Sequence, residues 1–139
     1  YLDDDTPHIK IQPHPHRSLK TKTSFRTIPL TGVSLVATRL LMTDALKAKS
    51  KYLIRQYNKT DKANGNSASA AIKKRFCVTS HTFRHELISR LRDAECPADI
   101  QSFITGHSIS TSSKHYGDKH QLSAKQKWLL KVAMDFSDD

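Results

Sequence analysis

Hydrophobic and polar positions follow two patterns along the chain of 139 residues, a short alternation near the N-terminus and helical spacing over most of the remainder. Ile9 and Ile11 alternate with polar neighbours and predict a strand over residues 8–12. A similar short run predicts a second strand over residues 25–30. Because the connection between them, residues 13–24, is polar, basic and contains proline, we expect an antiparallel β-ribbon with a loose tip.

Helical spacing begins directly after the ribbon, which Gly32 is expected to end. Residues 33–47 predict a first helix, the composition of residues 58–66 predicts a loop, and Asn66 or Ser67 is expected to cap a second helix. The apolar positions of these two helices are Val33, Val36, Ala37, Leu40, Leu41, Leu46, Ala71, Ile72 and Phe76.

Two further helices are marked by their end signals. Thr79 or Ser80 can cap a helix over residues 81–94. Pro97 suits the first turn of a short helix, which Gly106 is expected to stop.

The last predicted helix covers residues 123–136, where Ser123 and Gln126 form a capping-box pattern. Its apolar side is expected to dock on the core of the same chain, with packing onto a neighbouring protomer as the alternative. The chain thus predicts one mainly α-helical domain with a small antiparallel β-ribbon. The apolar positions of the last helix are Leu122, Trp128, Leu129, Val132, Ala133 and Phe136.

Charge adds a binding partner to this picture. Lys and Arg total 23 against 13 Asp and Glu, for a formal net charge of +10. Residues 10–92 hold 18 of the basic residues and only three acidic ones, so this stretch carries +15. Such segregation predicts a polyanion, either nucleic acid or an anionic membrane. Nucleic acid is favoured, because no apolar run approaches the ~18 residues that a membrane-spanning helix needs.

The two cysteines, Cys77 and Cys96, offer neither a disulfide framework nor the ligand spacing of a zinc site. This usage fits a reducing setting, and we expect a cytoplasmic, nucleoid-associated protein.

The predicted helix over residues 81–94 carries an arginine in an unusual place. Arg84 falls inside its apolar arc, and His81 lies one turn before it on the same side. A buried arginine is costly unless an anion satisfies it. Two interpretations stay open: a structural ion pair, or a site where His81, Arg84 and the helix N-terminus converge on a phosphate. The arc consists of Phe83, Leu87, Ile88 and Leu91.

A second polar cluster follows Gly106. His107 lies 23 residues after Arg84, and Tyr116 lies nine residues after His107. Together with His81, this series resembles the tyrosine recombinase (phage integrase) family over about residues 1–136. The segments that carry the resemblance are HTFRH at 81–85, TGHS at 105–108, STSSKHY at 110–116 and, as the β-ribbon, LKTKTSFRTIPL at 19–30.

The resemblance implies the catalytic core of a DNA breaking and rejoining enzyme that works through a covalent 3′-phosphotyrosyl intermediate. It implies Tyr116 as the nucleophile, Arg84 and His107 as donors to the phosphate oxygens, and His81 as an acid–base group. The residue types suit this chemistry, because a planar guanidinium binds two oxygens at once and a phenol, with a pKa of ~10, must lose its proton as it attacks. No metal or other cofactor is implied.

A lysine of the ribbon is implied as the acid that protonates the 5′-oxygen leaving group. Lys20 is favoured because its Lys-Thr pair resembles that of the family, and Lys22 remains the alternative. Other basic side chains are expected to contact DNA phosphates, a solvated helix face being the alternative. They are Lys22, Arg26, Lys73, Lys74, Arg75, Arg90 and Arg92.

One family residue, a further arginine upstream of the ribbon, has no match in the chain. We therefore expect residues 1–139 to be a fragment of a recombinase catalytic domain, without the family's N-terminal DNA-binding domain and defective in cleavage by itself. The implied partners are double-stranded attachment-site DNA and, in the full-length protein, further copies in a homotetramer. The implied process is integration or excision of a phage or other mobile element.

Two other functions fit part of the sequence. A non-catalytic helical DNA-binding module would use the basic stretch alone and would not need Tyr116. A type IB topoisomerase-like relaxing enzyme shares the chemistry, but the compact spacing from His107 to Tyr116 favours the recombinase. A metal hydrolase fits poorly, because His81 and His85 lack the acidic partner of a metalloprotease helix.

Overall fold

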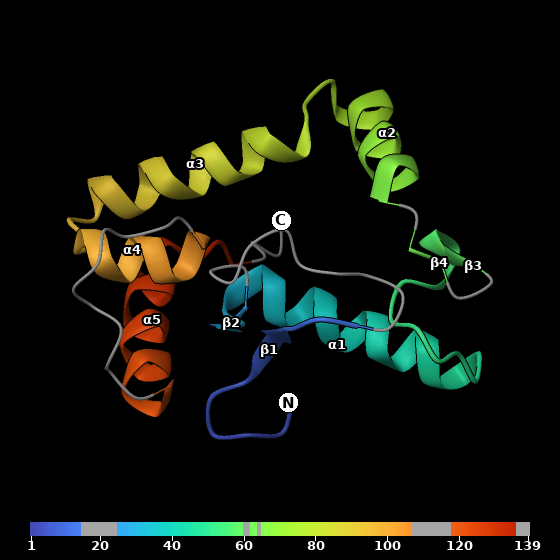
Figure 1. The fold of residues 1–139 in the computed structure, drawn as a ribbon, viewed down its shortest axis with the longest axis horizontal. Coiled ribbons are helices and arrows are strands. Elements are labelled where there is room, and N and C mark those ends of the chain that lie inside the picture. The colour runs from blue at the N-terminus through green and yellow to red at the C-terminus, as the bar shows by residue number, and fades with distance from the viewer. Residues whose placement is uncertain (15–24, 60–61, 64, 107–117, 136–139) are drawn as a thin grey trace.

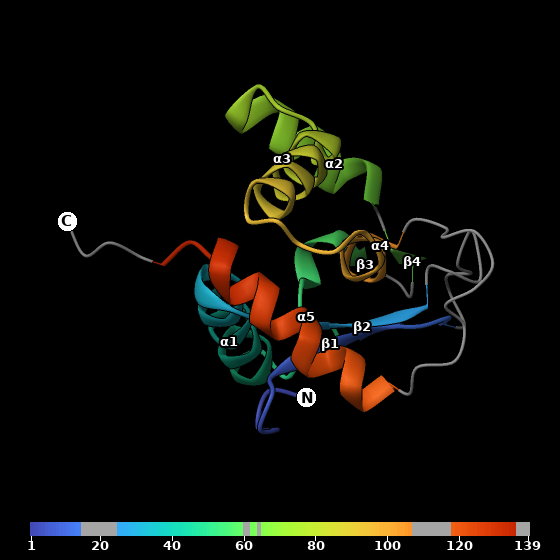
Figure 2. The same cartoon turned by 90° about the vertical axis from the view of Figure 1, so that its left-hand side faces the viewer.

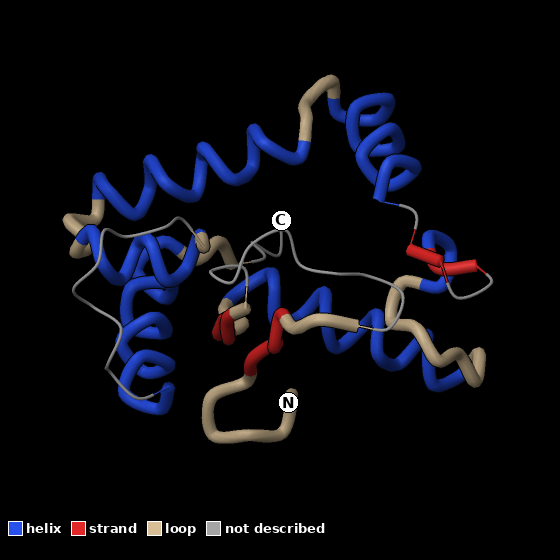
Figure 3. Tube along the Cα trace, viewed as in Figure 1, coloured by secondary structure: helices blue, strands red, loops and turns tan. Residues whose placement is uncertain are grey.

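The computed structural model of the chain describes residues 1–14, 25–59, 62–63, 65–106 and 118–135. Over these residues the architecture is mainly helical, with five α-helices and two small antiparallel two-stranded sheets (Figures 1 and 3). The mainly α fold with an antiparallel ribbon is therefore confirmed. No helix in the described ranges combines the length and the apolar character needed to cross a bilayer.

The N-terminal ribbon forms as predicted, within a residue or two at its ends. Strand β1 (His8–Ile11) pairs antiparallel with β2 (Arg26–Pro29), and Ile9 lies opposite Ile28. The pairing places Ile11 opposite Arg26, so that Arg26 opens the second strand. The predicted tip falls mostly on residues 15–24, which lie outside the described part of the chain.

Helix α1 (Gly32–Lys47) confirms the helix predicted over 33–47 and begins one residue earlier. Gly32 is its first residue and not the end of the ribbon. The Ser34 hydroxyl donates to the Thr31 carbonyl at 2.6 Å and accepts from the Thr31 N–H at 3.0 Å. A Cβ at Gly32 would collide with the Met134 carbonyl oxygen, which accepts a hydrogen bond from the Val33 N–H at 2.8 Å.

The apolar face predicted for α1 is largely exposed. Ala45 is buried, whereas Leu40 and Leu46 are 64% and 70% exposed. Periodicity predicts which residues share a helix face, but whether that face is covered depends on what packs against it. Only the N-terminal turns of α1 line an open cleft, through Val33, Ser34 and Ala37, and Leu40 and Leu46 do not line it.

The prediction of a plain loop over residues 58–66 is wrong at both ends. Strands β3 (Asn58–Lys59) and β4 (Lys62–Ala63) form a minimal hairpin after a single 3-10 turn, η2 (Arg55–Tyr57). Helix α2 (Gly65–Phe76) then starts before the predicted caps, so Asn66 and Ser67 lie in its first turn. Pairing of two residues per strand leaves no periodicity that a sequence pattern could reveal.

The next two helices match their end signals. Helix α3 (Ser80–Asp93) has Thr79 as its N-cap, whose N–H donates to Thr82 Oγ1 at 3.3 Å. Helix α4 (Ala98–Thr105) follows Pro97 and ends at Gly106. Gly106 has a φ of +74°, the left-handed conformation that favours glycine.

Helix α5 (Asp118–Val132) corrects the last prediction, which covered residues 123–136. It begins five residues earlier and ends at Val132, so Ser123 lies inside the helix and the predicted capping box with Gln126 is wrong. A capping-box pattern cannot stop a helix from continuing upstream when the preceding residues also favour it. Phe136 lies outside the described residues.

The main core forms where α3, α4 and α5 meet β2. Leu91 is fully buried there, and Cys96, Ile104 and Leu129 are buried around it. Figure 2 shows α5 crossing β1 and β2. Burying a leucine side chain stabilises a fold by roughly 1.5–3 kcal/mol. The predicted docking of the last helix on the chain's own core is therefore confirmed. Ile28, Leu87, Ile100, Trp128 and Val132 pack against this cluster from outside.

The two cysteines should differ in reactivity. Cys77 is exposed, whereas Cys96 is buried in the core. Burial and the nearby Asp99 carboxylate raise the pKa of the Cys96 thiol. The thiolate is the reactive species, so a higher pKa means slower thiol–disulfide exchange at pH 8. We expect one fast and one slow thiol in a titration with a chromogenic disulfide reagent.

The Cys77→Ser variant is the control and should lose the fast phase, and denaturation in urea should make both thiols fast. Two fast thiols in the native protein would contradict the core described above.

Candidate functional site

An open cleft of about 1050 Å³ lies between α1 and α3, with β2 and the ends of α4 and α5 also lining it. Most of its wall is apolar, and its charged and polar groups come chiefly from α3 and β2. The apolar residues that line it are Ile9, Ile28, Pro29, Leu30, Val33, Ala37, Phe83, Leu87, Ile104, Leu129, Val132, Ala133 and Met134.

Two of the sequence-predicted residues, His81 and Arg84, line this cleft from the first turns of α3. Arg84 is half-buried and His81 is exposed. The apolar arc around Arg84 is only partly buried: Leu91 and Leu87 belong to the core, but Phe83 is 53% exposed. The N-terminal half of α3 therefore presents its residues to the cleft rather than to a closed core.

Arg26 reaches the same cleft from β2. Its side chain is half-buried, and its Nε–H donates to the Ile104 carbonyl oxygen at 3.2 Å. Burial and, after it, the neighbouring positive charge of Arg84 lower the pKa of Arg26. A guanidinium stays protonated in proteins even so, and two arginines thus bring positive charge to one end of the cleft.

The remaining predicted catalytic residues cannot be placed beside them. His107, Tyr116, Lys20 and Lys22 all lie outside the described residues. Thr105 lines the cleft, and Gly106 ends α4 immediately before His107 in the sequence.

The basic residues predicted to contact DNA are arranged in two ways. Lys73, Lys74 and Arg75 are exposed on the last turn of α2, which precedes the N-terminal end of α3 by a few residues (Figure 1). Arg90 lines the cleft and pairs there with Glu86, another lining residue of the same helix, through an Nε–Oε1 contact of 2.8 Å. Arg92 is exposed near the end of α3.

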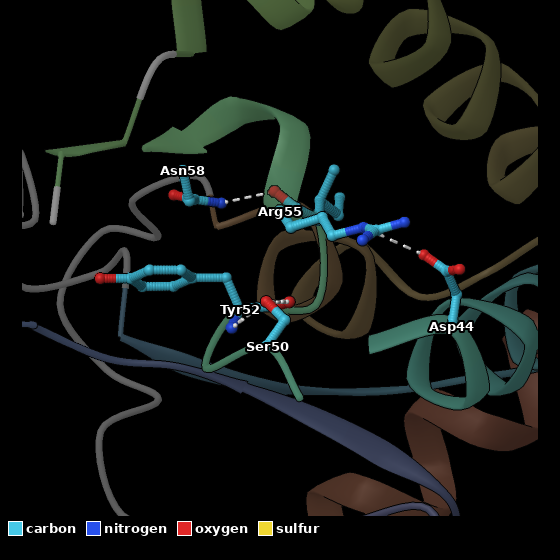
Figure 4. A network of polar contacts seen from close by, with 6 residues as sticks. Asp44, Ser50, Tyr52, Arg55 and Asn58 are labelled. Atoms are coloured by element: carbon cyan, nitrogen blue, oxygen red, sulfur yellow. Dashed lines mark hydrogen bonds and ion pairs between the residues drawn. The ribbon is translucent and has the colours of Figure 1, made fainter. Parts of the chain in front are cut away.

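Arg55, in the segment after α1, does not line the cleft and pairs with an acidic side chain instead. Figure 4 shows Arg55 facing Asp44, with Nε 3.5 Å from Oδ2. Both side chains are more than half exposed, and such pairs contribute about 0–1 kcal/mol to stability. Two local bonds shape this segment, from Asn58 Nδ2 to the Ile54 carbonyl at 2.9 Å and from the Ser50 hydroxyl to the Tyr52 carbonyl at 2.9 Å.

Sequence reasoning missed one buried cation, Lys125 of α5. Its side chain is only 3% exposed, and its ammonium donates to the Thr27 carbonyl of β2 at 3.0 Å. It also lies 5.9 Å from the centre of the Phe103 ring. A signal existed, because Lys125 stands four residues before Leu129 on the same helix face. The contact ties α5 to the strand that carries Arg26.

Comparisons of the chain with protein-family models, with curated proteins and with solved structures find no match. Within the described ranges, no group of three or more His, Cys, Asp or Glu side chains is placed to hold a metal ion.

We expect Lys125→Ala to lower the free energy of unfolding by about 1–3 kcal/mol, because the Thr27 carbonyl loses a buried donor and the aliphatic stem loses its packing. Urea unfolding followed by circular dichroism measures this change. Lys127→Ala, on an exposed position of the same helix, is the matched control and should change stability by no more than about 0.5 kcal/mol. Equal losses in the two variants would show that the contact to Thr27 is not stabilising.

Proposed function

We propose that the chain is the catalytic part of a tyrosine-type site-specific DNA recombinase. The observation that carries the proposal is that His81 and Arg84, two members of the residue series that resembles the family, line one cleft. The position of Arg84 on the predicted helix and the motif spacing both point to these residues, and a shared cleft is what joint action on one phosphate requires. The residue series that ends in Gly106-His107 and Tyr116 supplies the rest of the argument.

In the proposed reaction, the Tyr116 hydroxyl oxygen attacks the scissile phosphorus and the bond to the 5′-oxygen breaks. The 5′-oxygen takes up a proton from the ribbon lysine, Lys20 or Lys22. His81 accepts the proton that the phenol loses. In the second step a 5′-hydroxyl oxygen attacks the phosphorus and gives its proton to the ribbon lysine, while the bond to the Tyr116 oxygen breaks and His81 returns a proton to that oxygen. The phosphodiester bond energy is kept, so rejoining needs no nucleotide cofactor.

Arg84 and His107 stabilise the charge that builds up on the non-bridging oxygens as the phosphorane forms. The cleft surrounding Arg84 is largely apolar. Apolar walls lower the local dielectric and strengthen the attraction between a guanidinium and a phosphate oxygen. This combination fits phosphoryl transfer better than simple adhesion to DNA.

The exposed basic residues of α2 fit a second part of the proposal, the DNA-binding surface. Lys73, Lys74 and Arg75 are exposed and belong to the stretch of residues 10–92 that carries +15. We propose that they contact the backbone of the same duplex whose phosphate enters the cleft. Contacts of this kind fix the position of the protein on DNA and do not read its sequence. Assembly of several copies on attachment-site DNA in the cytoplasm completes the proposal.

We expect the full-length natural protein to form a covalent adduct with a suitable DNA duplex and Tyr116→Phe to form none, because phenylalanine lacks the attacking oxygen. The duplexes are first selected from a random-sequence pool by their binding to the protein. A set of substrates is then made with one nick at each successive position, because cleavage near a nick releases a short fragment and the cleaved strand cannot be resealed. The adduct is detected as a band shift in a denaturing gel.

Tyr116→Phe should keep the DNA affinity of the unsubstituted protein, which controls for folding. Binding without any adduct, unchanged by Tyr116→Phe, would instead identify a non-catalytic DNA-binding module. Relaxation of supercoiled plasmid without sequence preference would identify a topoisomerase-like enzyme.

We expect the double variant Lys73→Ala/Lys74→Ala to bind every duplex more weakly and to reduce the slope of log affinity against log salt by about 1 for each lysine removed. Fluorescence anisotropy with specific and unrelated duplexes, between low and moderate salt, measures both. The matched control is Lys127→Ala/Lys131→Ala, two exposed lysines of α5, which should leave affinity and slope unchanged. The same loss in both double variants would show that the basic face of α2 is not the DNA-binding surface.

A further inference from the structure

Arg26 contacts the C-terminal turn of α4 more closely than a side chain that only reaches for DNA would need to. Its Nε–H donates to the Ile104 carbonyl, one of the last carbonyls of α4, which have no partner within the helix. The contact joins residues 78 positions apart in the chain. Arg26 therefore caps the helix from outside, through β2.

The guanidinium also packs against Gly106. A Cβ built on Gly106 would lie 2.6 Å from Arg26 Nη1, 2.8 Å from Cζ and 3.2 Å from Nε. Two of these distances are shorter than real Cβ contacts allow, so an alanine at this position would displace the Arg26 guanidinium from the Ile104 carbonyl and would also adopt an unfavourable φ of +74°. The Arg26 guanidinium thus occupies the space that a side chain at position 106 would need.

This arrangement has an electrostatic cost. Arg26 lies close enough to Arg84 for the two positive charges to disfavour each other, and burial adds to the penalty. A capping contact on α4 alone could be made more cheaply by a neutral side chain. Functional sites commonly contain locally unfavourable arrangements of this kind, which the stability of the rest of the fold maintains.

We propose that Arg26 is a positioning residue: it clamps the C-terminal turn of α4 at Ile104 and Gly106, the turn from which the sequence continues to His107. The catalytic consequence of this contact rests on the proposed function of the cleft. The clamp on α4 does not depend on that function. The competing role for Arg26 is a phosphate contact on the DNA backbone, which needs a positive charge but not the fit to Gly106.

The clamp is tested by a double-mutant cycle on thermal stability with Arg26→Ala, Gly106→Ala and the double variant. In the unsubstituted background Gly106→Ala suffers both the unfavourable φ and the collision with the guanidinium. In the Arg26→Ala background only the φ penalty remains. We expect the fall in melting temperature caused by Gly106→Ala to be smaller there, because displacement of the guanidinium from the Ile104 carbonyl no longer contributes to it.

Arg39→Ala, an exposed arginine of α1, is the matched background and should leave the effect of Gly106→Ala unchanged. Arg26→Lys takes the place of Arg26→Ala in the cycle if circular dichroism shows that the alanine variant does not fold. Equal falls in melting temperature in all backgrounds would overturn the clamp, whatever the protein does to DNA.

The positioning role is tested by single-turnover adduct formation with saturating suicide duplex in the full-length natural protein. Arg26→Lys keeps the charge but not the planar fork that fits Gly106. We expect Arg26→Lys and Gly106→Ala to slow adduct formation at least about tenfold, because small displacements of catalytic groups have large effects, while the Kd for DNA stays within about twofold.

A normal rate in Arg26→Lys, or a loss confined to DNA affinity, would assign Arg26 to phosphate contact and overturn the positioning role. Absence of any adduct in the unsubstituted protein would overturn the proposed function instead, and the stability cycle would still decide the clamp.

Discussion

The burial of Leu91 between α3, α4 and α5 is the contact on which the other features depend. It anchors α3 by its C-terminal half, where Leu87 joins the same cluster, whereas Phe83 in the N-terminal half stays exposed. Because a helix is stiff, an anchor at one end fixes the direction of the other. His81 and Arg84 are therefore held over the cleft by packing that lies two to three turns away from them, and α1 borders the cleft from the opposite side (Figure 1).

Strand β2 connects this core with the charged end of the cleft. Lys125 of α5 donates to the Thr27 carbonyl, and Arg26, the preceding residue, donates to the Ile104 carbonyl of α4. Two cationic side chains thus tie a four-residue strand to two helices, Lys125 to α5 and Arg26 to α4. Repulsion between Arg26 and Arg84 lowers the stability of the folded state. The buried leucines and these two hydrogen bonds offset this cost.

Local signals in the sequence predicted most element positions, and the errors have identifiable causes. Thr79 and Gly106 set helix ends through their own backbone and side-chain chemistry, so both were predictable. Helix α5 starts five residues before Ser123, because a capping pattern inside a helix-forming stretch is not a start signal by itself. The exposure of Leu40 could not be foreseen, because periodicity defines a face and not its cover.

The sequence by itself determined the mainly helical class, the ribbon, the basic stretch and the motif spacing that selected His81 and Arg84. These are properties of near neighbours along the chain, where periodicity, capping and charge act directly. Only the tertiary structure decided that Arg26 joins Arg84 in one cleft, that it fits the face of Gly106, and that Lys125 is buried against Thr27. These contacts join residues from 58 to 98 positions apart, and no local pattern encodes which distant carbonyl or glycine a side chain meets once helices pack.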